Sequence, residues 1–398
     1  MGYPKTVEEM LAVCVGCGLC RTGDSRGMRL DDGGFLKPAD MKEGEMEAMA
    51  AYCPSANSPQ KWPDSVWGDY LEAYLGWSAN ENIRFRSSSG GVTTGVLCGL
   101  LDQGLVDCVL CVKAVPDNPA GAQGFICRTP CEVEECCGSR YVTCSPLLPI
   151  EELFRGTVNF AVVGRPCDIK GLRLYFEAHP EYRERCAAML SFFCAGTPSS
   201  FAASRLLDKL GVTEENIESL RYRGCGWPGK AVAKSASGDE ASISYEESWG
   251  RILGRDISSY CRFCFDGVGD CADIASGDAW LLNSDGTGPD FSEHPGRNIV
   301  FARTERGKSL LALFRENGSI VLEPFSDFGY LDTIQKFQAS RRGLLYYRTL
   351  ALKFAGRRFE AAPLSRLAKY RGTVSKGDAL RVFLGTWKRV LSGKIKVY

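Results

Sequence analysis

Two groups of closely spaced cysteines are the most chemically specific feature of this sequence. Cys261, Cys264 and Cys271 follow C-x2-C-x6-C spacing in the segment CRFCFDGVGDCADIASGDAW, which also carries Asp273 and Asp278. Thiolates bind soft metals, and two cysteines separated by two residues can reach one metal centre from a single turn. Three ligands do not close a metal site, so a fourth ligand is expected from another part of the chain.

The other group lies near the N-terminus. Cys14, Cys17 and Cys20 form the C-x2-C-x2-C run CVGCGLC, and Cys53 is followed by proline. This is the pattern of bacterial ferredoxins, with Cys53 as the expected fourth ligand. The run brings three thiolates closer together than the paired knuckles of zinc sites, so an iron–sulfur cluster is favoured over zinc, with buried free thiols as the alternative. Two such groups in one chain predict electron transfer.

The composition sets limits on fold and chemistry. The 398 residues are 44% hydrophobic, enough for two or three domains with a sizeable core, and only 2 are histidine. So few histidines argue against a histidine-based catalytic triad. We see no signal peptide and no run of roughly 18 apolar residues that would span a membrane. We therefore expect a reducing cytoplasm, in which clustered cysteines indicate metal rather than disulfides.

The elements between the two cysteine groups alternate helices with buried strands, which predicts an α/β fold. Val92–Gln103 is expected to be an apolar helix, and 106–115, 157–164 and 187–193 are expected to be buried strands. Cys167 and Cys194 follow the last two strands at equivalent positions, where α/β sheets place their sites. Each is a candidate fourth ligand for the Cys261 group, and the sequence does not choose between them.

Small residues precede the first of these helices. Backbone N–H groups at such a helix start are free to bind an anion, so the segment fits a cofactor phosphate, with a well-capped helix and no ligand as the alternative. The residues concerned are Arg84, Arg86, Ser87, Ser88, Ser89, Gly90 and Gly91. A later loop, RYRGCGWPG, offers Arg221, Arg223 and Trp227 to stack on a ring and pair with a carboxylate or phosphate; an ordinary strand exit is equally compatible.

Other cysteines lack a ligand pattern. Cys98, Cys108 and Cys111 fall in apolar elements and are expected in the core. Five more lie between positions 127 and 144: Cys127, Cys131, Cys136, Cys137 and Cys144. Their spacing matches no standard ligand set, so we interpret them as spare thiols, with a third metal site as the alternative.

The charge is concentrated at the C-terminal end. Residues 335–398 contain 16 Lys and Arg against 2 Asp and Glu, while the whole chain has no net charge. Bulky apolar residues alternate with these basic ones, which suits an acidic partner or an anionic membrane surface. The favoured alternative is a helical appendage that packs its apolar side on the body. No nucleic-acid-binding motif accompanies the charge.

Taken in order, the motifs resemble those of the coenzyme F420-reducing hydrogenase/dehydrogenase β-subunit family, which also includes ferredoxin-linked chlorophyllide reductases. The matching segments are CVGCGLC (14–20), RFRSSSGGV (84–92), VVGRPCDIKGLR (162–173), FFCAGTPS (193–200), RYRGCGWPG (221–229) and CRFCFDGVGDCADIASGDAW (261–280). The resemblance implies a flavoprotein with FAD and one or two [4Fe–4S] clusters that exchanges single electrons with a ferredoxin or redox partner subunit, and a hydride with coenzyme F420 or another small-molecule substrate.

On this basis we expect three parts. Residues 1–75 form a ferredoxin-like [4Fe–4S] module, 76–334 an α/β catalytic domain for FAD and the second cluster, and 335–398 a basic, mainly helical extension. The protein is expected in the cytoplasm, with the extension allowing peripheral contact with a membrane. The alternatives are a ferredoxin-dependent reductase that does not use F420, a non-catalytic electron-relay subunit of a larger complex, and a zinc-stabilised binding protein.

Overall fold

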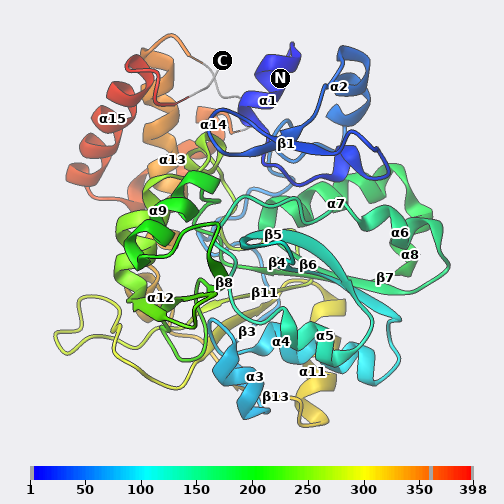
Figure 1. The fold of residues 1–398 in the computed structure, drawn as a ribbon. Helices are drawn as coiled ribbons and strands as arrows, with labels where there is room; N and C mark the ends of the chain where they lie inside the picture. The colour runs from blue at the N-terminus through cyan, green and yellow to red at the C-terminus, as the bar shows by residue number, and fades with distance from the viewer. Residues whose placement is uncertain (1–3, 358–361, 396–398) are drawn as a thin grey trace.

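An eight-stranded mixed sheet forms the centre of the molecule (Figure 1), in a computed structural model that describes residues 4–357 and 362–395. Its strand order is β13-β3-β12-β11-β7-β6-β4-β5. The strands are β3 (Glu72–Ser78), β4 (Cys108–Val115), β5 (Asn118–Cys127), β6 (Phe160–Gly164), β7 (Cys186–Phe192), β11 (Ile274–Asp278), β12 (Asn298–Ala302) and β13 (Ile320–Pro324). The predicted α/β class is confirmed, together with the three buried strands β4, β6 and β7.

The middle of the sheet is parallel. Strand β6 runs parallel to both β4 and β7, and β7 runs parallel to β11, whereas β3, β5, β12 and β13 pair antiparallel with their neighbours. The carboxyl ends of β4, β6, β7 and β11 therefore meet at one edge of the sheet. Ligand sites of α/β proteins lie at such an edge.

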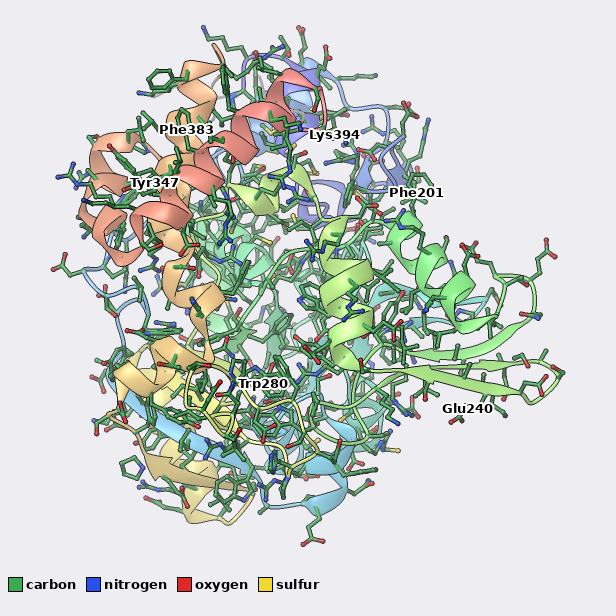
Figure 2. All side chains as sticks on the ribbon, turned by 90° about the vertical axis from the view of Figure 1, so that its left-hand side faces the viewer. Phe201, Glu240, Trp280, Tyr347, Phe383 and Lys394 are labelled. Atoms are coloured by element: carbon green, nitrogen blue, oxygen red, sulfur yellow. The ribbon has the colours of Figure 1, made fainter. Side chains whose placement is uncertain are left out.

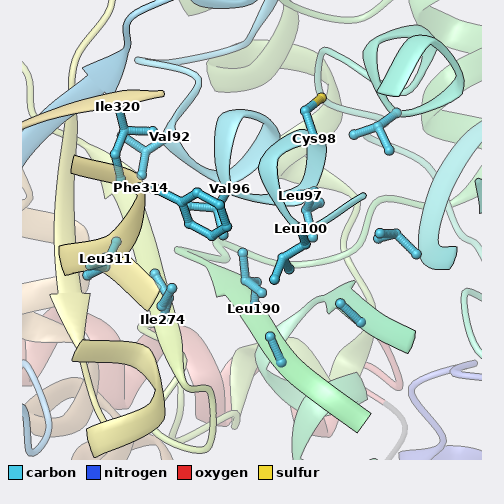
Figure 3. Close-up of a cluster of buried hydrophobic side chains, with 14 of the residues drawn as sticks. Val92, Val96, Leu97, Cys98, Leu100, Leu190, Ile274, Leu311, Phe314 and Ile320 are labelled. Atoms are coloured by element: carbon cyan, nitrogen blue, oxygen red, sulfur yellow. The ribbon is translucent and has the colours of Figure 1, made fainter. Parts of the chain in front are cut away.

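Helices cover both faces of the sheet because its central strands are apolar on both sides. On β4, Val109 and Cys111 point to one core, while Cys108 and Leu110 point to the other. The first face is covered by α3 (Glu81–Arg86), α4 (Val92–Asp102), α5 (Pro130–Glu135) and α11 (Glu305–Glu316). The second is covered by α6 (Ile150–Arg155), α7 (Pro166–Ala178) and α8 (Pro180–Arg185). Figure 3 shows the α4 side chains facing strands β7 and β11 in the first core.

The N-terminal part is a small separate layer beside α7 (Figure 1). Its elements are α1 (Val7–Val13), η1 (Leu19–Arg21), β1 (Met28–Leu30), β2 (Leu36–Pro38) and α2 (Glu43–Ala50). The sequence predicts a loop over 23–34, and this is wrong for 28–30, which pair with β2 in a hairpin. The Asp31 carboxylate closes the turn by accepting hydrogen bonds from the N–H groups of Gly33 and Phe35 at 2.9 Å each. The Gly- and Asp-rich composition indicated the turn but not the two short strands on either side of it.

A second sheet lies beside the first. It contains β8 (Ile217–Arg221), β9 (Ala231–Ser235) and β10 (Glu240–Ile243), and Figure 2 shows its outer hairpin projecting from the body near Glu240. The helical segments around it are α9 (Ser200–Leu210), η2 (Glu246–Ile252) and η3 (Leu253–Arg255), and α10 (Ser259–Arg262), which follows them, packs instead near Val13 of α1. Helix α9 buries its apolar side against this sheet.

The C-terminal part is mainly helical over its described residues, as predicted; residues 358–361 and 396–398 lie outside them. It contains α12 (Phe328–Ile334), α13 (Lys336–Phe354), α14 (Leu364–Leu367), η4 (Ala368–Thr373) and α15 (Lys376–Leu391). Leu345 and Leu352 of α13 share one buried cluster with Val13 of α1 and with Phe263 and Phe265. The C-terminal helices thus pack directly on the cysteine-bearing segments. Within the described residues, no helix has the length and apolar character needed to cross a bilayer.

Candidate functional site

The four N-terminal cysteines line one pocket, as the sequence predicts. Cys14 ends α1, Cys17 lies in the following turn, Cys20 belongs to η1 and Cys53 follows α2. The turn depends on Gly16, whose φ of 68° is the left-handed conformation. A Cβ at that glycine would also lie 2.7 Å from the backbone oxygen of Leu36. Only glycine therefore permits this turn to carry the thiols to one place.

These thiols are close enough to affect one another. Burial raises the pKa of Cys17 well above its usual range, and Cys20, Cys14 and Cys53 raise it further. Burial and the thiols of Cys14 and Cys53 likewise raise the pKa of Cys20. The four sulfurs nevertheless supply no set of three within 4.8 Å of one another among the described residues, whereas sulfurs around a single tetrahedral zinc lie about 3.8 Å apart. Which metal centre these four thiols would hold stays a prediction.

The second cysteine group gathers at the carboxyl-end edge of the sheet. Cys264 and Cys271 line another pocket together with Cys167. Cys261 lies close to Cys194: burial raises the pKa of Cys194 to about 11, with Cys261 as the next contribution. The backbone N–H of Thr197 donates to the Cys261 sulfur at 3.4 Å. The structure thus brings together all three members of the predicted C-x2-C-x6-C set and both candidate fourth ligands.

The positions of those two candidates agree with the strand-end argument. Cys167 lies in the first turn of α7 after β6, and Cys194 follows β7. Burial raises the pKa of Cys167, and Cys194 and Cys264 raise it further, so the three thiols are neighbours. Five cysteines therefore surround the site, one more than a [4Fe–4S] cluster needs. The choice of fourth ligand stays a prediction.

Lys170 and Tyr260 lie between the two cysteine groups. The ammonium of Lys170 donates to the backbone oxygens of Pro54 at 2.8 Å and Asn57 at 2.5 Å. Burial lowers the pKa of Lys170, while Cys271, Cys264 and Cys53 oppose that change. Burial raises the pKa of Tyr260, with further contributions from thiols of both groups. The two groups are therefore adjacent across these side chains. Lys170 lies in the motif of Cys167 and Tyr260 directly precedes Cys261, but the sequence does not show that these segments meet the N-terminal cysteines.

Two arginines of α13 are buried against the second group. Arg341 is 5% exposed and donates to the backbone oxygen of Cys194 at 2.6 Å. Arg342 is 1% exposed and pairs with Asp270 at 2.5 Å. Net charge alone predicts that the basic C-terminal stretch faces outward, toward a partner or a membrane. This prediction is wrong for Arg341 and Arg342. Both side chains instead donate hydrogen bonds inside the protein, because the carbonyl and carboxylate oxygens of the cysteine segment are hydrogen-bond acceptors that lie away from solvent.

The small-residue segment ends one helix and begins another. Arg84 and Arg86 lie in α3, a short helix that the sequence analysis missed, and Ser87 ends it. Helix α4 begins at Val92, and Gly91 before it has φ of 79° and gives no side-chain cap to the helix. The backbone of this helix start therefore fits the predicted phosphate cradle.

The side chains of the segment have partners within the protein. Arg84 donates to the backbone oxygen of Gly296 at 2.7 Å, and Arg86 pairs with Glu134 at 3.4 Å. Ser88 accepts from Ser139 at 2.8 Å. Ser87 contacts the Cys137 sulfur, and Ser89 donates to a backbone oxygen of residue 297. Gly90 admits no side chain, because a Cβ there would lie 2.7 Å from Asn298 Oδ1. The Val92 N–H already donates to Asn298 Oδ1 at 3.3 Å, and the Ser87 N–H donates to the Ile83 oxygen. The backbone N–H groups of residues 88–91, rather than these hydroxyls, are therefore the donors left for an anion.

The loop with Arg221, Arg223 and Trp227 packs against the end of α3, since the Gly226 N–H donates to the Phe85 backbone oxygen at 3.0 Å. Arg223 pairs with Asp278 at 2.8 Å, and the Trp227 indole N–H donates to the same carboxylate at 2.8 Å. Arg223 and Trp227 are both buried, so their assignment to cofactor or substrate contact stays a prediction.

Trp280 and Arg221 complete the surroundings of this loop. Trp280 stacks on Trp227 with ring centroids 4.7 Å apart, and it closes the motif that starts at Cys261. Arg221 is placed differently from Arg223, because its Nε is buried without a hydrogen-bond partner among the described residues. The Nε atoms of Arg21, Arg140 and Arg303 are in the same situation, so a ligand contact of Arg221 stays a prediction.

Two family models match this chain, and both describe the beta subunit of coenzyme F420 hydrogenase/dehydrogenase. The model of its N-terminal part covers residues 73–150, and the model of its C-terminal part covers residues 158–327. The chain belongs to the coenzyme F420 hydrogenase/dehydrogenase β-subunit family. The matched ranges contain the small-residue segment and the second cysteine group, whereas the N-terminal cysteines and the C-terminal helices lie outside both.

Individual relatives agree with this family. The chain is 26% identical to a subunit of the F(420)H(2) dehydrogenase of Methanosarcina mazei, over 81% of this chain and 88% of that protein. It is 22% identical to the beta subunit of coenzyme F420 hydrogenase from Methanothermobacter thermautotrophicus, over 70% of this chain and 93% of that protein. A chain of the F420-reducing [NiFe] hydrogenase complex from Methanosarcina barkeri has the same fold, with a TM-score of 0.55 and 19% identity over 72% of this chain and 96% of that one.

Proposed function

We propose that this member of the family is an iron–sulfur flavoprotein oxidoreductase that moves electrons between a one-electron redox partner and coenzyme F420. The observation that carries the proposal is the adjacency of the two cysteine groups: Lys170 donates to the Pro54 oxygen beside Cys53 and, with Tyr260, lines the pocket of Cys264 and Cys271. Two redox centres separated by only a few side chains would form a path for electrons. A zinc-stabilised binding protein would not require two metal centres next to each other. The names of the relatives, which include an F420H2 dehydrogenase, support F420 as the substrate.

The residues present fit the cofactors that this proposal requires. Cys14, Cys17, Cys20 and Cys53 would hold one [4Fe–4S] cluster, since all four line one pocket. The second would use Cys261, Cys264 and Cys271 with Cys167 or Cys194. The backbone of 88–91 at the α4 start would hold FAD phosphate, and Arg221 has a buried donor to offer. When bound, FAD supplies the exchange between one hydride and two single electrons that clusters carry.

The chain's own residues prepare this site. Arg341 donates hydrogen bonds to the backbone oxygens of Cys194 at 2.6 Å and Cys264 at 3.5 Å. These bonds fix two cysteine-bearing segments relative to α13. Asp266 accepts three backbone N–H bonds from residues 268–270 and shapes the turn between Cys264 and Cys271. These contacts hold the ligands in place before any metal binds.

For the partner we propose a redox protein with an acidic surface. Helix α15 exposes an apolar row at helical spacing: Leu380, Leu384, Trp387 and Leu391. Basic residues Lys388 and Arg389 adjoin the row, and Figure 2 shows this helix on the outside of the molecule near Phe383 and Lys394. An exposed apolar row bordered by cations fits a protein partner that carries carboxylates around an apolar centre.

The cofactor content tests the proposed function directly. Protein purified without oxygen is expected to contain about eight iron and eight acid-labile sulfide per chain, with one FAD. Reduced F420 is then expected to bleach the flavin absorbance, whereas bleaching by reduced ferredoxin alone would favour the reductase that does not use F420. Zinc without flavin would overturn the proposal. About four iron would mean that one of the two cysteine groups holds no cluster.

Lys170 offers a second test, because it is a positive charge between the two groups. We expect Lys170→Met to make both cluster reduction potentials more negative, since removing a cation disfavours the added electron. One charge acting over roughly 10 Å at an effective dielectric constant of about 20 gives a shift on the order of 70 mV. Redox titration followed by electron paramagnetic resonance measures it. Lys209→Met, which changes an exposed lysine paired with Glu247, is the control and should leave both potentials unchanged.

A further inference from the structure

Three cysteines outside both proposed cluster sites meet beneath the small-residue segment. The sulfurs of Cys111, Cys127 and Cys136 all lie within 4.8 Å of one another. Cys111 comes from β4, Cys127 from the end of β5 and Cys136 from the C-terminal end of α5. The sequence predicts Cys111 in the core and Cys127 and Cys136 as spare thiols, with a third metal site among the cysteines of 127–144 as the alternative, but it did not group these three. It missed the trio because the pairing of β4 with β5, which places Val109 opposite Cys127, unites residues that no short spacing connects.

We propose that Cys111, Cys127 and Cys136 bind one soft d10 metal ion, with Zn²⁺ as the ion to test. The Cys127 and Cys136 sulfurs are 3.7 Å apart. Around a single zinc with Zn–S bonds of about 2.3 Å, tetrahedral geometry places sulfurs about 3.8 Å apart. The Cys127–Cys136 pair therefore has the spacing of a mononuclear site, and the Cys111 sulfur lies within 4.8 Å of both.

Burial favours the same ion class. Cys111 and Cys127 are buried with 2% and 0% exposure, while Cys136 is partly exposed. Sulfur ligands favour a soft cation over Ca²⁺ or Mg²⁺, which require oxygen ligands. Three protein ligands leave a fourth position on a tetrahedral ion, which a water molecule would fill on the partly exposed side at Cys136.

The neighbouring cysteines have other partners. The Cys137 sulfur contacts the hydroxyls of Ser87 and Thr94 at 3.7 Å. The Cys98 sulfur donates to the backbone oxygen of Pro130 at 3.7 Å. Cys131 is exposed on α5. The trio is thus a separate set within this cysteine-rich region.

The bound ion would fasten α5 to the edge of the large sheet. A six-residue helix is marginal without tertiary support, and β5 is the edge strand. The segment that follows α5 brings Ser139 to Ser88 in the small-residue segment. Fixing α5 therefore also fixes one wall of that segment.

The test compares two cysteines of the same short region in the full-length protein, purified with its iron and then dialysed with Zn²⁺. We expect about one zinc per chain in the unchanged protein and in Cys131→Ser, and a loss of that zinc in Cys136→Ser, with equal iron in all three. Absorption at the zinc K-edge, to which iron does not contribute, should give three Zn–S distances of about 2.3 Å. Cys136 is partly exposed, so this variant is expected to fold, and circular dichroism checks it.

Several outcomes would overturn the proposal. Zinc retained in Cys136→Ser would place the ion elsewhere, and zinc that rises only as iron falls would place it in the cluster sites. No zinc in the unchanged protein would leave the trio as free thiols. A chain mass lower by two hydrogens, mapped to Cys127 and Cys136, would identify a disulfide pair in place of a metal site.

Discussion

Replacing Cys17 with alanine is expected to remove about four of eight iron atoms per chain and to bring electron exchange with a one-electron partner down to the background rate. Cys17 is 8% exposed and lies among the three other N-terminal thiols. A cluster that loses one of four thiolate ligands in a buried pocket has no replacement within reach, because the pocket is lined mainly by apolar side chains and backbone. Flavin reduction by F420H2 should persist, since the matched family ranges exclude this pocket.

The control for this prediction is Cys186→Ala. Cys186 is fully buried at the start of β7, in the core on the α7 face of the sheet, and it belongs to neither cysteine group. The iron content of this variant should match that of the unchanged protein. Iron and sulfide analysis, together with partner-dependent and F420-dependent rates, gives the comparison. A Cys17→Ala protein with all its iron, or a folded one with none, would contradict the assignment of two independent centres.

Local sequence patterns predicted which cysteines lie together, because those cysteines are linked by short spacings. The C-x2-C runs, the strand ends at Cys167 and Cys194, and the helix at Val92 all depend on neighbours within a few residues. These predictions agree with where the structure places the residues. The assembly of Cys111 with Cys127 and Cys136 depends instead on strand pairing, which a single sequence does not display.

Charge counting failed for a related reason. Arg341 and Arg342 belong to a stretch with 16 basic residues, and net charge predicts such residues at the surface. The structure buries both, because they meet the Cys194 carbonyl and the Asp270 carboxylate, which lie 147 and 72 residues earlier in the chain. The location of a basic residue therefore depends on the acceptor that it contacts. For both arginines this acceptor is distant in sequence, so the charge pattern of the C-terminal stretch does not reveal it.

Arg342→Leu is expected to lower the free energy of unfolding by about 3–5 kcal/mol, the cost of leaving a buried charge without its partner. Arg342 pairs with Asp270 at 2.5 Å and donates to the Ser65 oxygen at 2.7 Å. Arg303 is the other cation near Asp270, at 3.9 Å. The change would leave Asp270 close to a second carboxylate, the half-buried Asp266, whose pKa is already raised by desolvation and by Asp270. Denaturant unfolding without oxygen measures the difference.

Two further variants decide whether the charge pair or the packing of Arg342 causes the loss. Arg381→Leu breaks an ion pair with Asp378 whose side chains are 79% and 35% exposed, so we expect a change of only about 0–1 kcal/mol. Arg342→Leu combined with Asp270→Asn removes the unpaired charge and should recover part of the lost stability. If the double variant is no more stable than Arg342→Leu, the loss comes from the packing of the guanidinium over Phe265, whose ring centroid lies 4.4 Å from the guanidinium carbon. Recovery of stability in the double variant would instead mean that Arg342 holds α13 on the cysteine segment by neutralising the charge of Asp270.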